Sequence, residues 1–289
     1  MDKFNICLIK PENYLHSYAF LELGELIHYS LQDLGYESLL SFNHVKPSFK
    51  NIIIGAHLLS SSAILNLPTS SVILNTEQIY GDATPWSRNI FYNAVKIFEI
   101  WDYSEKNIEK FASIGIHQAK HFKIGFQKEL IRIDTTKDKD IDVLFYGGLN
   151  KRRKDILEQL EAKGLRVKTL FGVYAEVRDE WIERSKLVLN HHYFDAHIFE
   201  IVRVFYLLTN AVAVVGEVNE TTSIDSMCKD GIYSAKYESL VDACVAIVKD
   251  DVLRMDLQHQ AIHSISRYPQ KLFTQEVISA NGYSTEERK

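Results

Sequence analysis

Apolar residues in the first part of the chain alternate between short continuous runs and stretches with helical spacing. The runs at 4–9, 51–56 and 71–75 (FNICLI, NIIIGA and SVILN) are typical of strands buried on both faces of a parallel sheet. Residues 18–34 instead place apolar side chains three and four positions apart, and Gly35 predicts the end of that helix. The same alternation continues with a helix at 85–98, a strand at 99–104 and a helix at 104–113. Strands that alternate with helices predict crossover connections in a parallel sheet.

The alternation restarts after a wholly polar segment, 134–140 (DTTKDKD), which is the best candidate for a linker. Beyond it the pattern predicts strands at 142–148, 166–172, 187–193 and 211–217, and helices at 151–163, 179–186, 199–209 and 239–249. The sequence therefore predicts two doubly wound α/β domains, the first over residues 1–137 and the second over 138–289. A single doubly wound domain with a long appendage fits the pattern less well.

Ligands of open parallel sheets bind beyond the carboxyl ends of the strands, where helix N-termini offer unpaired N–H groups. The first such loop is 10–17 (KPENYLHS), in which His16 stands at the start of the predicted helix and Glu12 lies upstream in the same loop. A neutral imidazole there can accept a proton from an attacking hydroxyl, because its pKa lies near neutrality. Capping or packing at the helix N-terminus is the alternative, and spacing alone favours it.

The second loop, 146–154 (YGGLNKRRK), combines a flexible backbone with positive charge. Two glycines permit close approach of the chain and three cations begin the next helix: Gly147, Gly148, Arg152, Arg153 and Lys154. Cations are unfavourable in a first helical turn, so their presence indicates a bound anion such as a diphosphate. A solvated basic turn explains the same residues equally well, and the spacing is not that of a P-loop or of G-x-G-x-x-G.

The third stretch, 187–217, places Glu200 and Arg203 three residues apart on an otherwise apolar helix. At that spacing they share a helix face, where they can form a salt bridge or point to a ligand, the glutamate toward ribose hydroxyls and the arginine toward phosphate. His191 and His192 lie on opposite faces of the predicted strand, and the sequence has no CxxC or HExxH motif. The sequence therefore predicts no zinc site.

The segment RVFYLLTNAVAVVGE (203–217) resembles a motif of GT-B glycosyltransferases of the glycosyl transferases group 1 type, R-x-F-E-x-L-x-x-G followed by a P-V-V strand. Arg203 and Phe205 match in order, and Val214 and Val215 stand for the strand. LFGVYAEVRDEWIERSKLVLN is similar to the family's nucleobase loop, helix and strand, and FYGGLNKRRKDIL to the loop that grips the donor diphosphate. YLHSYAFLELGELIHYSLQDLGYES resembles the helix-one region, where many relatives place an acceptor-side histidine, and His16 falls there.

The resemblance implies an α/β protein with two Rossmann-like domains facing a cleft, the second of which holds a nucleotide-sugar. The donor-binding residues are then Gly147, Gly148, Asn150, Arg152, Lys154, Gly172, Glu200, Arg203, Tyr206 and Glu217. The catalytic residues are His16, as general base if the enzyme inverts, and Glu12.

Three positions depart from the family pattern, since Tyr206 stands for its glutamate, Ala211 for its glycine and Ala213 for its proline. That glutamate binds the donor ribose in relatives, so the task passes to the Tyr206 hydroxyl, to Glu200 or to Glu217. The earlier glutamate of retaining relatives is also missing, so the pattern predicts neither retention nor inversion.

The resemblance thus implies a metal-independent glycosyltransferase of the hexosyltransferase type, acting in glycan biosynthesis. It would move a sugar from a nucleotide-sugar donor to a hydroxyl of a glycan or small-molecule acceptor, without a cofactor. The alternatives are a GT-B-like nucleotide-sugar epimerase or hydrolase, and a catalytically inactive nucleotide-sugar-binding protein, which the tyrosine at position 206 favours.

Charge and composition narrow the expected partners. The net charge of -5, from 33 basic and 38 acidic residues, argues against nucleic acid, because proteins that bind it usually carry a basic excess. The N-terminal apolar run is too short for a secretion signal, and no stretch approaches the ~20 apolar residues of a membrane helix. Three distant cysteines, Cys7, Cys228 and Cys244, lack metal-ligand spacing. We expect a cytoplasmic protein without a transmembrane segment, and peripheral membrane contact stays open.

Overall fold

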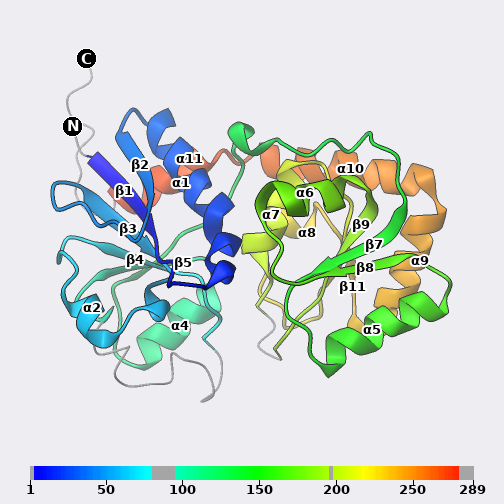
Figure 1. Ribbon diagram of the computed structural model, residues 1–289, viewed down its shortest axis with the longest axis horizontal. Helices are drawn as coiled ribbons and strands as arrows, with labels where there is room; N and C mark the ends of the chain where they lie inside the picture. Colours follow the sequence, from blue (N-terminus) through cyan, green and yellow to red (C-terminus); the bar gives the residue numbers. More distant parts are fainter. Residues whose placement is uncertain (1–2, 80–94, 195–197, 280–289) are drawn as a thin grey trace. The chain divides into compact units, whose positions relative to one another are not determined.

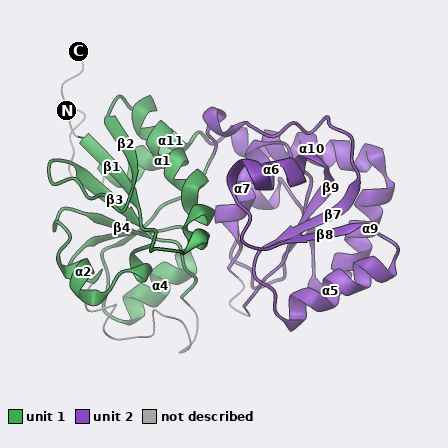
Figure 2. Ribbon diagram, in the orientation of Figure 1, with its two compact units in different colours: residues 1–125, 269–289 green, residues 126–268 purple. Residues whose placement is uncertain are grey.

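The computed structural model describes residues 3–79, 95–194 and 198–279 of the chain (Figure 1). They fall into two compact units (Figure 2). The first unit comprises Met1–Gly125 together with Pro269–Lys289, and the second comprises Phe126–Tyr268. Each unit has its own parallel sheet, as the two successive alternations of strands and helices predict.

The first unit is built on a six-stranded sheet in the order β2-β1-β3-β4-β5-β6, in which all neighbouring strands are parallel. Its strands are β1 (Lys3–Leu8), β2 (Glu37–Phe42), β3 (Lys50–Ile54), β4 (Val72–Asn75), β5 (Glu99–Asp102) and β6 (Ala119–His121). Its helices are α1 (Leu21–Asp33), α2 (Ser61–Leu65), α4 (Glu105–Ser113) and α11 (Gln270–Ser279), with short 3₁₀ turns η1 (Leu15–Phe20) and η2 (Ala56–Leu58). The helix predicted at 85–98 lies mostly outside the described residues.

The second unit is built on a five-stranded parallel sheet in the order β11-β10-β9-β7-β8. Its strands are β7 (Ile141–Tyr146), β8 (Val167–Leu170), β9 (Ser185–Asn190), β10 (Val214–Glu217) and β11 (Tyr233–Ala235). Its helices are α5 (Lys151–Ala162), α6 (Ala175–Glu183), α7 (Ile201–Thr209), α8 (Ser226–Lys229), α9 (Leu240–Lys249) and α10 (Asp251–Ser266), with 3₁₀ turns η4 (Lys128–Leu130) and η5 (Tyr237–Ser239). The helix α10 has no counterpart among the predicted elements, because its apolar residues do not gather on one face.

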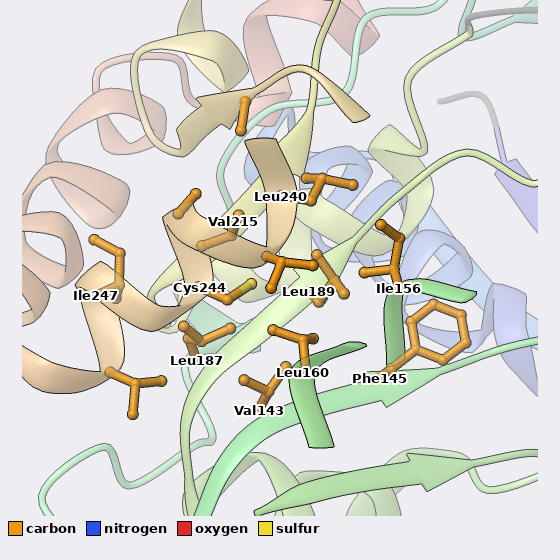
Figure 3. Close-up of a cluster of buried hydrophobic side chains, with 14 of the residues drawn as sticks. Val143, Phe145, Ile156, Leu160, Leu187, Leu189, Val215, Leu240, Cys244 and Ile247 are labelled. Atoms are coloured by element: carbon orange, nitrogen blue, oxygen red, sulfur yellow. The ribbon is translucent and has the colours of Figure 1, made fainter. Parts of the chain in front are cut away.

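One face of the second sheet packs on α5 and α9 to form a core (Figure 3). Its fully buried members include Val143, Phe145, Leu187, Leu189, Val215, Leu160, Leu240, Cys244 and Ile247. Burying each large aliphatic side chain contributes about 1.5–3 kcal/mol before entropy is counted. This packing fixes α5 against β7 and β9, and so fixes the loop that joins β7 to α5.

The boundary between the units differs from the predicted one at 137–138. The polar segment 134–140 lies inside the second unit, where Lys137 pairs with Glu183 and Arg184 pairs with Asp140. The chain passes between the units at Gly125–Phe126 and again at Tyr268–Pro269. The polar segment 134–140 is therefore a loop of the second unit, held by ion pairs, and not the linker between the units.

The C-terminal helix α11 belongs to the first unit, although the predicted second domain runs to residue 289. Ser30 Oγ of α1 and Thr274 Oγ1 of α11 lie 2.8 Å apart, and both side chains are buried. The Gln270 Oε1 atom accepts a hydrogen bond of 2.6 Å from the backbone N–H of Gly125. These buried contacts join residues that are far apart in sequence, so local patterning does not reveal them.

Candidate functional site

The loop between β7 and α5 is shaped by two glycines and an asparagine cap. Gly147 has a φ of 134°, a conformation that favours glycine, and a Cβ built there would lie 2.8 Å from Arg203 Nη2. Asn150 caps α5, since its Oδ1 accepts a 3.0 Å hydrogen bond from the N–H of Arg153. Its Nδ2 donates to the carbonyl oxygen of Tyr193 at 2.8 Å. The loop thus brings backbone and a helix N-terminus to the carboxyl edge of the sheet.

Arg153 is the buried cation of this edge and is only 3% exposed. Its Nη1 donates to the carbonyl oxygen of Gly148 at 2.9 Å, and its Nη2 donates to that of His191 at 2.6 Å. The same Nη2 lies 3.8 Å from Glu200 Oε1. Arg153 therefore links the loop after β7 to the loop after β9.

Arg203 reaches the same edge from α7. Its Nη1 donates to Asn190 Oδ1 at 3.0 Å, and its guanidinium lies 5.1 Å from the ring centroid of Tyr146. Because a Cβ on Gly147 would contact Arg203, the guanidinium lies directly against the loop. Two guanidinium groups, from α5 and α7, thus meet at Gly147 and Gly148.

Glu200 is held as an anion beside these cations. Its Oε2 accepts from Asn190 Nδ2 at 3.0 Å and lies 3.2 Å from His192 Nδ1. Burial by itself raises the pKa of Glu200, but the hydrogen bond to His192 and the charges of Arg203 and Arg153 outweigh burial and lower that pKa to about 2. Glu200 is therefore ionised at neutral pH and offers acceptor oxygens.

Arg152 is committed to Glu217, the last residue of β10. Arg152 Nη1 donates to Glu217 Oε2 at 2.7 Å, and Nη2 pairs with the other carboxylate oxygen. The guanidinium of Arg152 also lies 3.9 Å from the ring centroid of Tyr237. Glu217, which is 1% exposed, additionally accepts a 3.0 Å hydrogen bond from the N–H of His192. The pair therefore holds the edge together and neutralises its own charge.

The remaining charges make this edge electropositive. With Arg152 paired to Glu217, two cations, Arg153 and Arg203, face one carboxylate, that of Glu200. Burial and then the charge of Arg203 lower the pKa of Arg153 to about 10. Burial and then the charge of Arg153 lower the pKa of His191 to about 3. An anion at this edge would relieve the crowding of positive charge.

Other predicted donor-binding residues lie differently. Lys154 is exposed on α5, and Gly172, with a φ of 70°, follows β8 in open space. Tyr206 is buried, and its hydroxyl donates to Asp179 Oδ2 at 2.7 Å. Tyr206 thus ties α7 to α6, and its hydroxyl is committed to a protein carboxylate.

In the first unit, the two predicted catalytic residues, Glu12 and His16, lie in the turn after β1 and in η1. Glu12 is exposed in the turn after β1. The ring of His16, in η1, lies 5.2 Å from the ring of Tyr14.

Three residues at the carboxyl edge of the second sheet are absent from the predicted donor-binding residues: Asn190, His192 and Arg153, which the sequence offered only as one of three cations after β7. A signal for Arg153 was present, because it shares a helix face with the buried Ile156 and Leu160 and must therefore point inward. The roles of Asn190 and His192 depend on which loop lies beside β9, which local sequence does not encode.

Across residues 3–79, 95–194 and 198–279, no three His, Cys, Asp or Glu side chains are placed to hold a metal ion. Within the same residues, no helix has the length and apolar character needed to cross a membrane.

No protein-family model matches the chain. Two curated relatives are uncharacterized proteins of Acanthamoeba polyphaga mimivirus. L140 is 27% identical over 218 residues, which are 72% of this chain and 68% of L140. L137 is 26% identical over 255 residues, which are 81% of this chain and 34% of L137. The chain thus spans about a third of L137.

Solved structures of GT-B glycosyltransferases share the fold. WaaG, a glycosyltransferase involved in lipopolysaccharide biosynthesis, has a TM-score of 0.58 and 12% identity over 97% of this chain and 100% of WaaG. T4 phage BGT, in complex with its UDP-glucose substrate, has a TM-score of 0.60 and 11% identity over 97% of this chain and 99% of BGT. HepE of Anabaena, in complex with UDP and glucose, has a TM-score of 0.61 and 11% identity over 98% of this chain and 100% of HepE. The chain has the GT-B fold, and the predicted fold class is confirmed.

Proposed function

We propose that this chain is a glycosyltransferase that moves a sugar from a nucleotide-sugar donor to a hydroxyl of a glycan or small molecule. The observation that carries the proposal is the meeting of Arg153, Arg203 and the Gly147–Gly148 loop at the N-terminus of α5. Backbone N–H groups, a helix dipole and guanidinium groups together suit a diphosphate. The fold shared with structures that contain UDP-glucose supports a UDP-sugar as the first donor to test.

The donor-side chemistry follows from the charges. Departure of a nucleoside diphosphate builds negative charge on phosphate oxygens, and preorganised cations stabilise it. We assign that role to Arg153 and Arg203, so that no metal ion is required. The ionised Glu200 and the neighbouring Asn190 offer acceptors to ribose hydroxyls, while Arg152 and Glu217 keep the edge in place.

Arg203 provides the test of this assignment. Arg203→Ala removes a charge-assisted contact to phosphate, so UDP affinity should fall by about 100-fold, which corresponds to about 2.7 kcal/mol. Uridine, which lacks the phosphates, should bind the variant as it binds the wild type. Lys163→Ala, an exposed change just after the C-terminal end of α5, is the control and should leave both affinities within about twofold. Calorimetric titration measures all four values.

Three outcomes separate the candidate functions. Release of UDP from UDP-glucose or another UDP-sugar that depends on an added hydroxyl acceptor is expected of the transferase. Release without an acceptor would indicate a hydrolase, and tight UDP binding without release would indicate a binding protein. If the wild type does not distinguish UDP from uridine, the phosphate assignment is wrong.

A further inference from the structure

A network of buried polar groups lies at the carboxyl ends of β4 and β5 in the first unit. Asp102, the last residue of β5, is fully buried. It accepts hydrogen bonds from Asn75 Nδ2 at 2.6 Å, from the N–H of Ser104 at 2.7 Å and from Asn107 Nδ2 at 3.1 Å. Burying a carboxyl group is costly unless it is hydrogen-bonded in this way. The network therefore rigidifies this edge of the sheet.

The network holds the backbone of Glu77 through hydrogen bonds to both its N–H and its carbonyl oxygen. Asn75 Oδ1 accepts from the N–H of Glu77 at 3.0 Å, while Asn75 Nδ2 and Asn107 Nδ2 each donate to its carbonyl oxygen at 2.9 Å. Asn107 Oδ1 accepts from the N–H of Ile79 at 2.9 Å. The side chain of Glu77 is nevertheless 36% exposed. A partly exposed carboxylate is thus carried on a fixed turn.

One oxygen of this carboxylate faces a histidine. His57, in η2 after β3, has its Nε2 atom 3.4 Å from Glu77 Oε1, and its side chain is 11% exposed. Burial lowers the pKa of His57 to about 4, so the imidazole is neutral near pH 7. In the tautomer that carries its proton on Nε2, the neutral ring presents this N–H toward the carboxylate. Among the described residues, Oε2 of Glu77 receives no hydrogen bond.

The loop after β1 approaches the same carboxylate. Burial, and then the negative charge of Glu77, raise the pKa of Tyr14. Burial also raises the pKa of Glu77 itself, since no cation among the described residues counters the loss of water. The titratable groups that face Glu77 within the described chain are His57 and Tyr14, and Asp102 lies behind Asn75 and Asn107.

We propose that Glu77 is the general base that deprotonates the hydroxyl of the acceptor, with His57 as its positioning residue. This inference rests on the proposed transferase function. The acceptor hydroxyl gives its proton to Glu77 Oε2, and its oxygen lone pair forms a bond to the anomeric carbon of the donor sugar. The bond from that carbon to the phosphate oxygen breaks, and its electron pair leaves with the nucleoside diphosphate. The configuration at the anomeric carbon is inverted.

Glu77 suits this role better than the pair that the sequence suggests. Glu12 is exposed, whereas Glu77 lies in a turn that hydrogen bonds from Asn75 and Asn107 hold in place. A general base works best when its pKa lies near the working pH, and burial moves Glu77 in that direction. His57 lies 3.4 Å from Oε1, and Oε2 is the oxygen that would meet the hydroxyl of a sugar or polyol.

The test uses the full chain with UDP-sugars as donors, and methyl glycosides and glycerol as acceptors. Glu77→Gln keeps the shape but cannot take a proton, so turnover should fall by about 10²–10⁴-fold while UDP affinity stays within twofold. Glu105→Gln is the matched control, because Glu105 also lies 3.4 Å from a histidine, His121, but is 72% exposed. Its turnover should equal that of the wild type.

The pH profile tests the part played by His57. Wild-type kcat/KM should fall as the pH drops through the raised pKa of Glu77. His57→Ala removes a donor to the carboxylate, which raises that pKa further and moves the acidic limb to higher pH, whereas His57→Gln retains a donor and should shift it less. A purely structural role for His57 would lower Tm without moving this limb.

Several results would overturn the assignment while the donor site stands. These are near-normal turnover of a folded Glu77→Gln protein and retention of the anomeric configuration. If Glu77→Gln does not fold, the turnover of Glu77→Asp and the pH profile of wild-type kcat/KM test the role of Glu77 instead. Normal turnover of Glu77→Asp together with a wild-type profile that is flat from pH 5 to 8 would also overturn the assignment. A wild type that does not bind UDP, or that binds UDP but releases it from no UDP-sugar tested, contradicts the proposed function instead.

Discussion

Two carboxylates, Glu200 in the second unit and Glu77 in the first, lie at the carboxyl ends of parallel sheets and have opposite electrostatic surroundings. Glu200 faces His192, Arg203 and Arg153, and its pKa falls to about 2. Glu77 faces a neutral imidazole, and burial raises its pKa. In both places asparagine side chains bridge neighbouring loops.

The difference shows how the carboxyl ends of two parallel sheets shift the pKa of a carboxylate in opposite directions. Where cations surround a carboxylate, its negative charge is fixed and it can only accept hydrogen bonds. Where cations are lacking, the carboxylate holds a proton more readily. The first arrangement suits binding of a charged ligand, and the second suits proton transfer.

The largest expected effect concerns the ion pair at the second edge. Arg152→Ala should destabilise the protein by about 3–5 kcal/mol, because Glu217 would stay buried without its partner. Urea unfolding measures this change. The double variant Arg152→Met with Glu217→Leu should recover much of the loss. If Arg152→Ala instead leaves stability unchanged and abolishes UDP binding, Arg152 serves the ligand and not the fold.

The next effect concerns the loop between β7 and α5, at the carboxyl edge of the second sheet. Gly147→Ala should cost about 1–3 kcal/mol, because the backbone there is strained for any other residue. It should also weaken UDP binding, since the new methyl group displaces the Arg203 guanidinium. Gly164→Ala is the control, because it too has a positive φ, of 82°, but its Cβ would meet nothing within 4 Å. Similar UDP affinities for both variants would remove the loop from the binding site.

The smallest expected effect is the pH dependence of folding stability, which should differ in sign between Glu200 and Glu77. The pKa of Glu200 is lower in the folded protein than in the unfolded chain, so its stabilisation is present above the unfolded value and is lost as pH falls toward 2. Wild-type stability relative to Glu200→Gln should therefore shrink by about 1 kcal/mol between pH 7 and pH 4. For Glu77, whose folded pKa is raised, the difference from Glu77→Gln should change in the opposite direction. Denaturant titrations at both pH values compare the variants.

Part of the candidate site could be predicted from local sequence. The glycines at 147 and 148 follow an apolar strand, and Arg203 lies in a helix that resembles a known motif, so both were found. The structure brings these residues together with Glu200 and Glu217. Tyr206 was predicted from its position in the motif and Lys154 from its charge. Neither property indicates the direction in which a side chain points. Glu77 and His57, which we propose as base and positioning residue, belong to no motif, so local sequence does not single them out.

The sequence by itself determined the fold class, since continuous apolar runs and helical spacing are local properties that burial imposes on strands and helices. It also determined that glycines and cations follow the first strand of the second sheet. Only the tertiary structure decided the partners. Arg152 meets Glu217, 65 positions away, because strand order leaves only β9 between β7 and β10. Asn75 meets Asp102, 27 positions away, because β4 and β5 are neighbouring strands. The same holds for α11, whose packing on α1 assigns the end of the chain to the first unit. Hydrogen bonds between loops depend on which strands are neighbours, and that order is set by packing over the whole sheet.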